Sequence, residues 1–310
     1  MSDTSQSEYL NPRVSEMRPM ISVAPEMLER FPRFSLYNSP YTAHDEGCAI
    51  DLYPHEGDWR DDGDGPGKTD ERETAAPSPV AGEVVATRSV SAPPKEYAVE
   101  RDHLIVVDTG DHLARMLHVR PAVEPGDEVA VGDSLGEMVR SGFFAPWVDN
   151  HIHLGFRSPD ADPFRASGSL PLELAPEVEL AGVPWDGRGT VVAAGDTYAV
   201  LDAPDHPSPG ECFAGIAPDR DDSGVLDGGF PHYDGGGVVG GVGGPVSLAG
   251  ERVGTAEDRT VAWVDATVVA NETPITGISF FFAREALGLK LVCPDASFEV
   301  GEEVEVSVTR

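Results

Sequence analysis

Apolar residues recur in short runs along this chain, many of them at every second position, and Gly, Pro and Asp turns separate the runs. Alternation over about four to eight residues is typical of strands. The pattern predicts an all-β chain with only two short helical stretches, at 27–31 and 284–288. The predicted strands are 34–41, 48–54, 82–90, 97–110, 112–119, 127–139, 151–157, 189–204, 245–256, 259–270, 275–283, 289–294 and a strand pair around a Gly turn within 297–308.

Breaks in this pattern divide the chain into an arm and two domains. Residues 1–20 are polar and are expected to form a loose N-terminal arm. A first domain is expected over 21–172, and a second β-rich domain over 173–310. Residues 56–79, rich in acid, Gly and Pro, predict a solvated loop. The glycine-rich run 235–244 lacks the Lys-Ser/Thr of a phosphate-binding loop and predicts a mobile loop instead.

The charge of the chain narrows its possible partners. The 310 residues contain 54 Asp and Glu against 22 Lys and Arg, a formal net charge of −32. Because no basic stripe exists to neutralise phosphates, nucleic acid is excluded as a partner. Only three basic residues are lysines (Lys68, Lys95 and Lys290). Dispersed carboxylates with almost no lysine resemble the proteins of salt-in halophilic archaea, where concentrated salt screens the repulsion.

The sequence also predicts in which cellular compartment the protein is found. No stretch reaches the roughly 18 consecutive apolar residues of a spanning helix, so no membrane partner is expected. The first residues lack the basic and apolar regions of a secretory signal. The cysteines (Cys48, Cys212 and Cys293) are odd in number and far apart, which fits a reducing interior. We expect a cytoplasmic protein, and the sequence leaves its oligomeric state open.

The segment richest in candidate chemistry is the His-x-His of His151 and His153. In a strand, residues two apart point to the same face, with Cα atoms about 6.6 Å apart. Two imidazoles can then converge on one metal, or on a metal and its water. Two histidines on a solvated strand face are the alternative reading of the same pattern.

The order of motifs around this segment resembles the lysostaphin-type zinc metalloendopeptidases, which are built on the duplicated hybrid motif. Those enzymes run through an Asp-containing strand, a "dGvV" strand, a "YxHL" strand, a Gly-Asp-x-Val-x-x-Gly segment and a final "HLHFEv" strand. The corresponding segments here are GCAIDLYP, VAGEVV, MLHV, VEPGDEVAVGDSLGEMVRSG and HIHLGF, within about residues 34–168. The resemblance implies a barrel-sandwich hybrid fold for the first domain.

The resemblance also implies roles for individual residues. Asp51 and His153 take the places of zinc ligands, His151 that of a catalytic histidine, and His118 that of its partner, which polarises water or stabilises the oxyanion. These residues imply Zn²⁺ as cofactor and a peptide-like substrate. The expected chemistry is hydrolysis of a peptide or similar amide bond by a metal-activated water. A non-catalytic binding module with a degraded metal site is the alternative function.

The first metal ligand is where the chain departs from the family. The family places this ligand four residues before the aspartate, where Gly47 stands here, and the nearest histidine is His44. In a straight strand His44 and Asp51 would lie about 23 Å apart and face opposite ways. A turn or bulge at Gly47 would bring His44 back. Otherwise Cys48 or His55 substitutes, or the ligand is missing.

Overall fold

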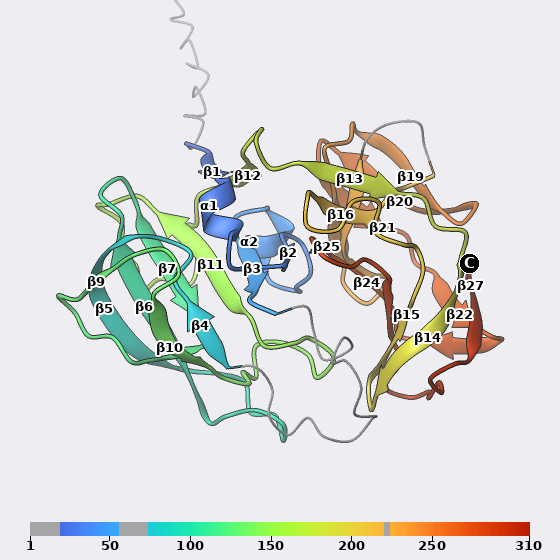
Figure 1. Cartoon of the computed structure of the whole chain (residues 1–310), viewed down its shortest axis with the longest axis horizontal. Coiled ribbons are helices and arrows are strands. Elements are labelled where there is room, and N and C mark those ends of the chain that lie inside the picture. The colour runs from blue at the N-terminus through green and yellow to red at the C-terminus, as the bar shows by residue number, and fades with distance from the viewer. Residues whose placement is uncertain (1–18, 56–73, 220–223) are drawn as a thin grey trace, which may run out of the picture.

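The computed structural model describes residues 19–55, 74–219 and 224–310 (Figure 1). Within these ranges the helices are single turns, α1 (Pro25–Leu28) and α2 (Thr42–Asp45), and the other regular elements are strands. The expectation of an all-β chain with two β-rich parts is therefore confirmed. Most of the expected arm (1–18) and of the expected acidic loop (56–73) lies outside the described residues. The end of that loop is a strand instead, β4 (Ala75–Pro77).

A sandwich of two sheets forms the N-terminal half, residues 19–174. The smaller sheet has the order β4, β10 (Ser134–Met138), β8 (Val119–Pro121). Its side chains Ala76, Val119 and Leu135 share one core with Ile105 and Met116 of the larger sheet. A parallel pair, β1 (Ile21–Val23) and β12 (Leu172–Leu174), joins the first strand of this half to the last. The larger sheet has the order β13 (Leu180–Val183), β16 (Phe213–Ile216), β25 (Phe282–Ala283), β2 (Arg33–Ser35), β3 (Ile50–Tyr53), β11 (Ile152–Arg157), β7 (Leu113–Leu117), β6 (Arg101–Asp108), β5 (Gly82–Ser91), β9 (Glu128–Val129).

The C-terminal half, residues 180–310, is built on a long antiparallel sheet. Alternating apolar residues explain why these segments form strands with one buried face. The last strand is the plainest example, because Val304, Val306 and Val308 are buried while the residues between them are exposed. The sheet encloses a second apolar core. Its order is β19 (Gly244–Leu248), β20 (Glu251–Glu257), β21 (Thr260–Trp263), β18 (Gly235–Val239), β17 (Val225–Phe230), β24 (Gly277–Phe280), β26 (Leu289–Val292), β15 (Tyr198–Leu201), β14 (Arg188–Gly195), β27 (Glu303–Thr309), β22 (Thr267–Ala270), β23 (Thr273–Ile275).

The two halves are joined by backbone pairing as well as by side chains. Strand β25 of the C-terminal half pairs with β2 of the N-terminal half, near the centre of the molecule (Figure 1). Phe34 stacks on Phe282 with ring centroids 4.7 Å apart and meets Phe213 edge-on at 4.8 Å. The sheet that carries the candidate site therefore continues into the second half.

The strand pleat separates the apolar core from the candidate site. Ile50 and Leu52 of β3, and Ile152 and Leu154 of β11, enter the N-terminal core. Alternation turns the intervening residues of both strands to the opposite face of the sheet. That face carries Asp51 and His153, which are direct partners in the antiparallel pair of β3 and β11.

Three local expectations were wrong. Residues 284–288 are not helical, because Arg284 and Gly288 bond to Pro32 and Pro204 of other segments and Gly288 has a φ of +85°. The glycine run does not form a loop throughout, since Gly235–Val239 is strand β18, paired on both sides. Only the second half of 297–308 is a strand, because Glu299 to Glu302 form a turn.

Candidate metal centre

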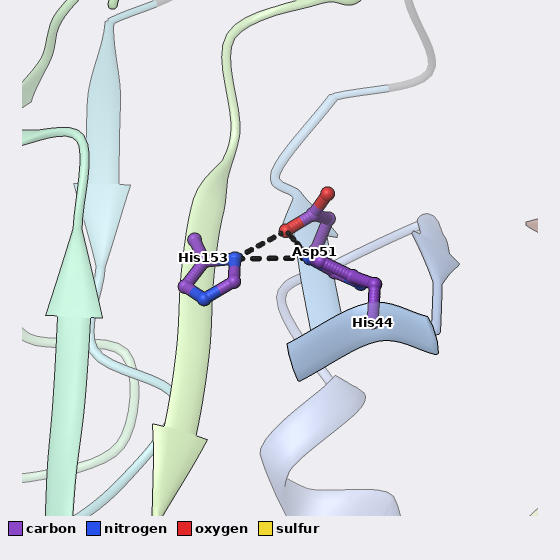
Figure 2. Close-up of side chains that lie close together, drawn as sticks. All are labelled: His44, Asp51 and His153. Carbon is purple, nitrogen blue, oxygen red and sulfur yellow. Dashed lines mark hydrogen bonds and ion pairs between the residues drawn. The ribbon is translucent and has the colours of Figure 1, made fainter. Parts of the chain in front are cut away.

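Three potential metal ligands from separate elements meet at one point. His44 comes from α2, Asp51 from β3 and His153 from β11, as Figure 2 shows. His44 Nε2 lies 3.0 Å from His153 Nδ1, and His153 Nδ1 lies 3.0 Å from Asp51 Oδ1. The third side of the triangle, from His44 Nε2 to Asp51 Oδ1, measures 3.2 Å. Neither Cys48 nor His55 belongs to this cluster.

His44 reaches the triangle because the chain turns sharply between α2 and β3. The Gly47 N–H bonds the carbonyl of His44 at 2.8 Å, and Cys48 N–H bonds that of Ala43 at 2.6 Å. Gly47 ends the helical turn with a φ of +61°, in the left-handed region. A Cβ at Gly47 would lie 2.7 Å from Arg259 Nη2. The turn at Gly47 thus replaces the straight strand in which His44 would have been remote.

The triangle fits a zinc ion. Zinc binds nitrogen and oxygen ligands at about 2.0–2.1 Å in tetrahedral geometry, which puts neighbouring ligand atoms about 3.3 Å apart. The sides of 3.0 and 3.2 Å are close to that value. Two imidazole nitrogens and one carboxylate oxygen leave a fourth tetrahedral position for water or substrate. The His153 side chain is 17% exposed, so the centre opens to solvent on that side.

A hydrogen bond behind His44 holds its ring for coordination. Its Nδ1–H donates to the carbonyl of Leu36 at 2.7 Å, which leaves the lone pair of Nε2 facing the other two ligand atoms. Burial by itself would lower the pKa of His44, but the Asp51 carboxylate and the Leu36 carbonyl together outweigh burial and raise it. A positive charge is therefore favoured inside the triangle.

The other two ligands have the protonation states that binding of a metal cation requires. Burial alone would raise the pKa of Asp51, yet His151 and His44 outweigh it and hold the pKa well below its usual range. Burial lowers the pKa of His153 to about 4, against the opposing effect of Asp51. Asp51 is thus ionised and His153 neutral at neutral pH, and metal binding requires both states.

His151 flanks the triangle as a neutral base. Its Nδ1–H donates to the carbonyl of Asp149 at 2.8 Å, so the lone pair of Nε2 is directed toward Asp51 Oδ2, 3.5 Å away. Burial lowers the pKa of His151 to about 4. The ring of Phe144 lies against it, with centroids 4.6 Å apart. This arrangement leaves an unprotonated nitrogen next to the metal ligands.

His118 lies next to His151, beside the triangle, and the carboxylate of Asp102 holds its ring in place. Its Nδ1–H donates to Asp102 Oδ2 at 2.6 Å, and its backbone N–H donates to Asp102 Oδ1 at 3.1 Å. Ser141 Oγ donates to the same carboxylate at 2.6 Å. The ring centroid of His118 is 5.0 Å from that of His151 and 5.9 Å from that of His153.

The structure brings all five sequence-predicted site residues together, and it adds one that sequence reasoning missed. Asp102 is fully buried, and its pKa is lowered because His118 and Ser141 outweigh the effect of burial. With 54 acidic residues in the chain, no sequence signal distinguishes Asp102 from its neighbours. Its place on β6, adjacent to the end of β7, becomes visible only once these strands pair.

No helix among residues 19–55, 74–219 and 224–310 combines the length and apolar character needed to cross a membrane. Comparison with curated proteins found no match, and comparison with solved structures also found none. Two family models match in succession. One is described as the N-terminal domain of a domain of unknown function (DUF8155) and matches residues 22–174, and the other as its C-terminal domain and matches residues 181–309. The chain therefore belongs to the DUF8155 family.

Proposed function

We propose that this protein is a zinc-dependent hydrolase that cleaves a peptide or similar amide bond. The observation that carries the proposal is the triangle of His44, Asp51 and His153, whose sides of 3.0–3.2 Å match three ligands of one tetrahedral ion. The two histidines beside it, His118 and His151, would supply the proton transfers that amide hydrolysis needs.

The proposed reaction adds water to the amide carbonyl carbon and then breaks the carbon–nitrogen bond, giving a carboxylate and an amine. Bound zinc lowers the pKa of a water molecule toward about 7 and polarises a carbonyl group. Nε2 of neutral His151 is placed to accept the proton of the attacking water. The protonated His151 can then return this proton to the leaving amine, while His118, oriented by Asp102, is placed to stabilise charge on the carbonyl oxygen when its Nε2 carries a proton.

Metal analysis tests the centre. Protein purified without chelator is expected to contain about one zinc per chain, and His153→Ala under about a tenth of that, because two ligands rarely hold zinc. His112→Ala, which changes a histidine away from the triangle, is the matched control and is expected to keep its zinc. Absence of metal from the wild-type protein would support the alternative, a non-catalytic binding module.

Activity is tested separately with fluorogenic peptides. His118→Ala and His151→Ala are expected to retain zinc while hydrolysis falls about 10²- to 10⁴-fold, since each removes a proton-transfer group and not a ligand. Zinc-loaded wild-type protein that cleaves no member of a broad peptide set would contradict the hydrolase proposal while leaving the metal site intact.

We also infer a cytoplasmic location in a salt-adapted cell. None of the three cysteines, all of which lie in the described part of the chain, forms a disulfide, which fits a reducing compartment. Cell fractionation with antibody detection checks the location, and recovery in the extracellular fraction would contradict it.

A further inference from the structure

A small pocket lies between the two halves, next to His151. The N-terminal half contributes Arg33, Tyr53 and Asp149, and the C-terminal half contributes Lys290. The pocket shares a wall with the metal centre, because the Asp149 carbonyl accepts the Nδ1–H of His151 at 2.8 Å. The rings of Tyr53 and His151 have centroids 5.3 Å apart.

The walls of this interdomain pocket carry more positive than negative charge. Arg33 and Lys290 are only 3% and 4% exposed, and both contact the carboxylate of Asp149. Burial alone would raise the pKa of Asp149, but Lys290 and Arg33 outweigh it and keep the pKa far below its usual range. The lining residues thus carry two positive charges and one negative charge at neutral pH. Such a wall in a chain of net charge −32 favours an anion.

Two buried polar atoms in the pocket walls have no hydrogen-bond partner. These are the Nε of Arg33, a donor, and the Oδ1 of Asn38, an acceptor. Asn38 is 7% exposed. Because buried polar groups are nearly always hydrogen-bonded, both atoms point to a ligand. A group that presents a carboxylate and an N–H close together would satisfy them.

The size of the pocket limits what can enter. Its space holds about one water-sized group. A side chain or a whole residue does not fit, whereas one oxygen of a terminal carboxylate does, with the remainder of the molecule outside the enclosed space. The occupant is therefore the end of a ligand.

The pocket lies one short step from the metal centre along β3. Asp51 and Tyr53 are two residues apart on this strand and face the same side, which places their Cα atoms about 6.6 Å apart. Tyr53 pairs with Arg33 of β2, while Asp51 pairs with His153 of β11. An extended peptide advances about 3.3–3.6 Å per residue. The spacing along β3 thus matches the distance between a terminal carboxylate and an amide bond one or two residues away.

We propose that the interdomain pocket binds the free α-carboxylate of a peptide-like substrate, so that the amide bond one or two residues from this carboxylate lies at the metal centre. The proposal rests on the hydrolase function proposed above and specifies its substrate class. It also gives the C-terminal half a role, because Lys290 of β26 supplies part of the carboxylate site.

Calorimetric titration of the full chain with N-acetyl-alanine and with N-acetyl-alaninamide tests the pocket, because these probes differ only in the carboxylate. The acid is expected to bind at least about tenfold more tightly than the amide. Lys290→Met is expected to weaken binding of the acid about ten- to a hundredfold, while Lys95→Met, at an exposed lysine, leaves it unchanged. Lys290→Arg, which keeps the charge, is expected to restore most of the binding.

Three outcomes of the titrations with wild type and Lys290→Met would overturn the proposal. They are equal affinity for acid and amide, undiminished binding by folded Lys290→Met, and binding of acetate as tight as that of N-acetyl-alanine, which would indicate a generic anion site. Titration of metal-free His153→Ala tests whether the carboxylate binds in the pocket or on the metal. Binding of N-acetyl-alanine to this variant is expected to persist. Loss of this binding together with the metal would place the carboxylate on zinc and contradict the pocket. Zinc content of Lys290→Met is expected to equal that of the wild type, so a failure of the pocket proposal can be distinguished from a failure of the hydrolase proposal.

Discussion

At the scale of single residues, the candidate centre depends on which ring nitrogen each histidine leaves available. The Nδ1–H groups of His44, His118 and His151 each donate to an oxygen that can only accept, a carbonyl or an ionised carboxylate. Each ring in its neutral form must then present the lone pair of Nε2. Three separate backbone and side-chain acceptors therefore prepare the ligand triangle and its two flanking histidines for cation and proton chemistry.

One residue of the C-terminal half supports this arrangement from behind. Asp227 of β17 accepts hydrogen bonds from the backbone N–H of Leu36 at 2.6 Å and of Tyr37 at 3.1 Å, and from Ser35 Oγ. The carbonyl of Leu36 in turn holds His44. Burial, only partly offset by these hydrogen bonds, raises the pKa of Asp227 from 3.8 to about 7.

This raised pKa predicts a specific dependence of stability on pH. Between the unfolded pKa of 3.8 and the folded pKa of about 7, the unfolded chain releases the Asp227 proton and the folded chain keeps it. The free energy of unfolding therefore falls as pH rises through this window, by roughly 4 kcal/mol from this residue. Asp227→Asn, which mimics the protonated form, is expected to lack that part of the fall in urea titrations at pH 4–7.

Exposed Asp265 provides the control for this measurement. Asp265→Asn is expected to follow the wild-type curve of unfolding free energy against pH. Parallel curves for the wild type and Asp227→Asn would show that Asp227 is ionised throughout this range in the folded chain.

At the scale of elements, the sequence contains enough to place part of the centre. The His-x-His spacing predicts that His151 and His153 share a face, and alternation with Ile152 and Leu154 predicts which face is apolar. Asp51 lies on the site face for the same reason, between core residues Ile50 and Leu52. The pairing of β3 with β11 then places Asp51 opposite His153.

The position of His44 could not be predicted in this way. Strand periodicity carries no information across α2 and Gly47, because a single residue in the left-handed region redirects the chain. The glycine strand β18 was mispredicted for a related reason. Its backbone pairs with β17 and β21, and Gly236 and Gly237 pack against Trp263 and Tyr37. Lack of space for a side chain, rather than a need for flexibility, therefore requires glycine there.

The turn at Gly47 yields a prediction at this scale. Gly47→Ala places a Cβ 2.7 Å from Arg259 Nη2 and 2.8 Å from Tyr37 Oη, at a φ of +61°. We expect a loss of unfolding free energy of about 2 kcal/mol, from strain at this φ and from the displaced neighbours. Zinc affinity, measured by competition with a chromogenic chelator, is expected to fall about tenfold or more because His44 moves.

Gly126→Ala distinguishes strain from misplacement of the ligand. Gly126 also has a positive φ, +99°, but a Cβ there meets nothing within 4 Å. This variant is expected to lose stability while keeping full zinc affinity. Unchanged zinc affinity in Gly47→Ala would mean that the turn does not position His44.

At the scale of the whole molecule, the net charge of −32 is expected to weaken the folded state through repulsion among the carboxylates. Exposed ion pairs such as Arg120–Glu137 and Arg188–Glu305 are worth little each. In about 1 M KCl the Debye length shrinks to about 3 Å, which screens repulsion among the carboxylates. The midpoint of thermal unfolding is therefore expected to rise by about 10 °C or more between dilute buffer and about 1 M KCl.

Circular dichroism melts over a KCl series check this expectation at constant pH. An unfolding midpoint that is the same in dilute buffer and in concentrated KCl would contradict salt adaptation of this chain.

The pairing of β2 with β25 has a practical consequence for experiments on this family. A truncated protein that ends near residue 175 would leave the backbone amides and carbonyls of β2 open along one edge, a template for association with other chains. It would also deprive the Leu36 segment of Asp227. Self-association and inactivity of such a fragment would therefore result from the loss of the β25 partner of β2. They would say nothing about the chemistry of the intact molecule.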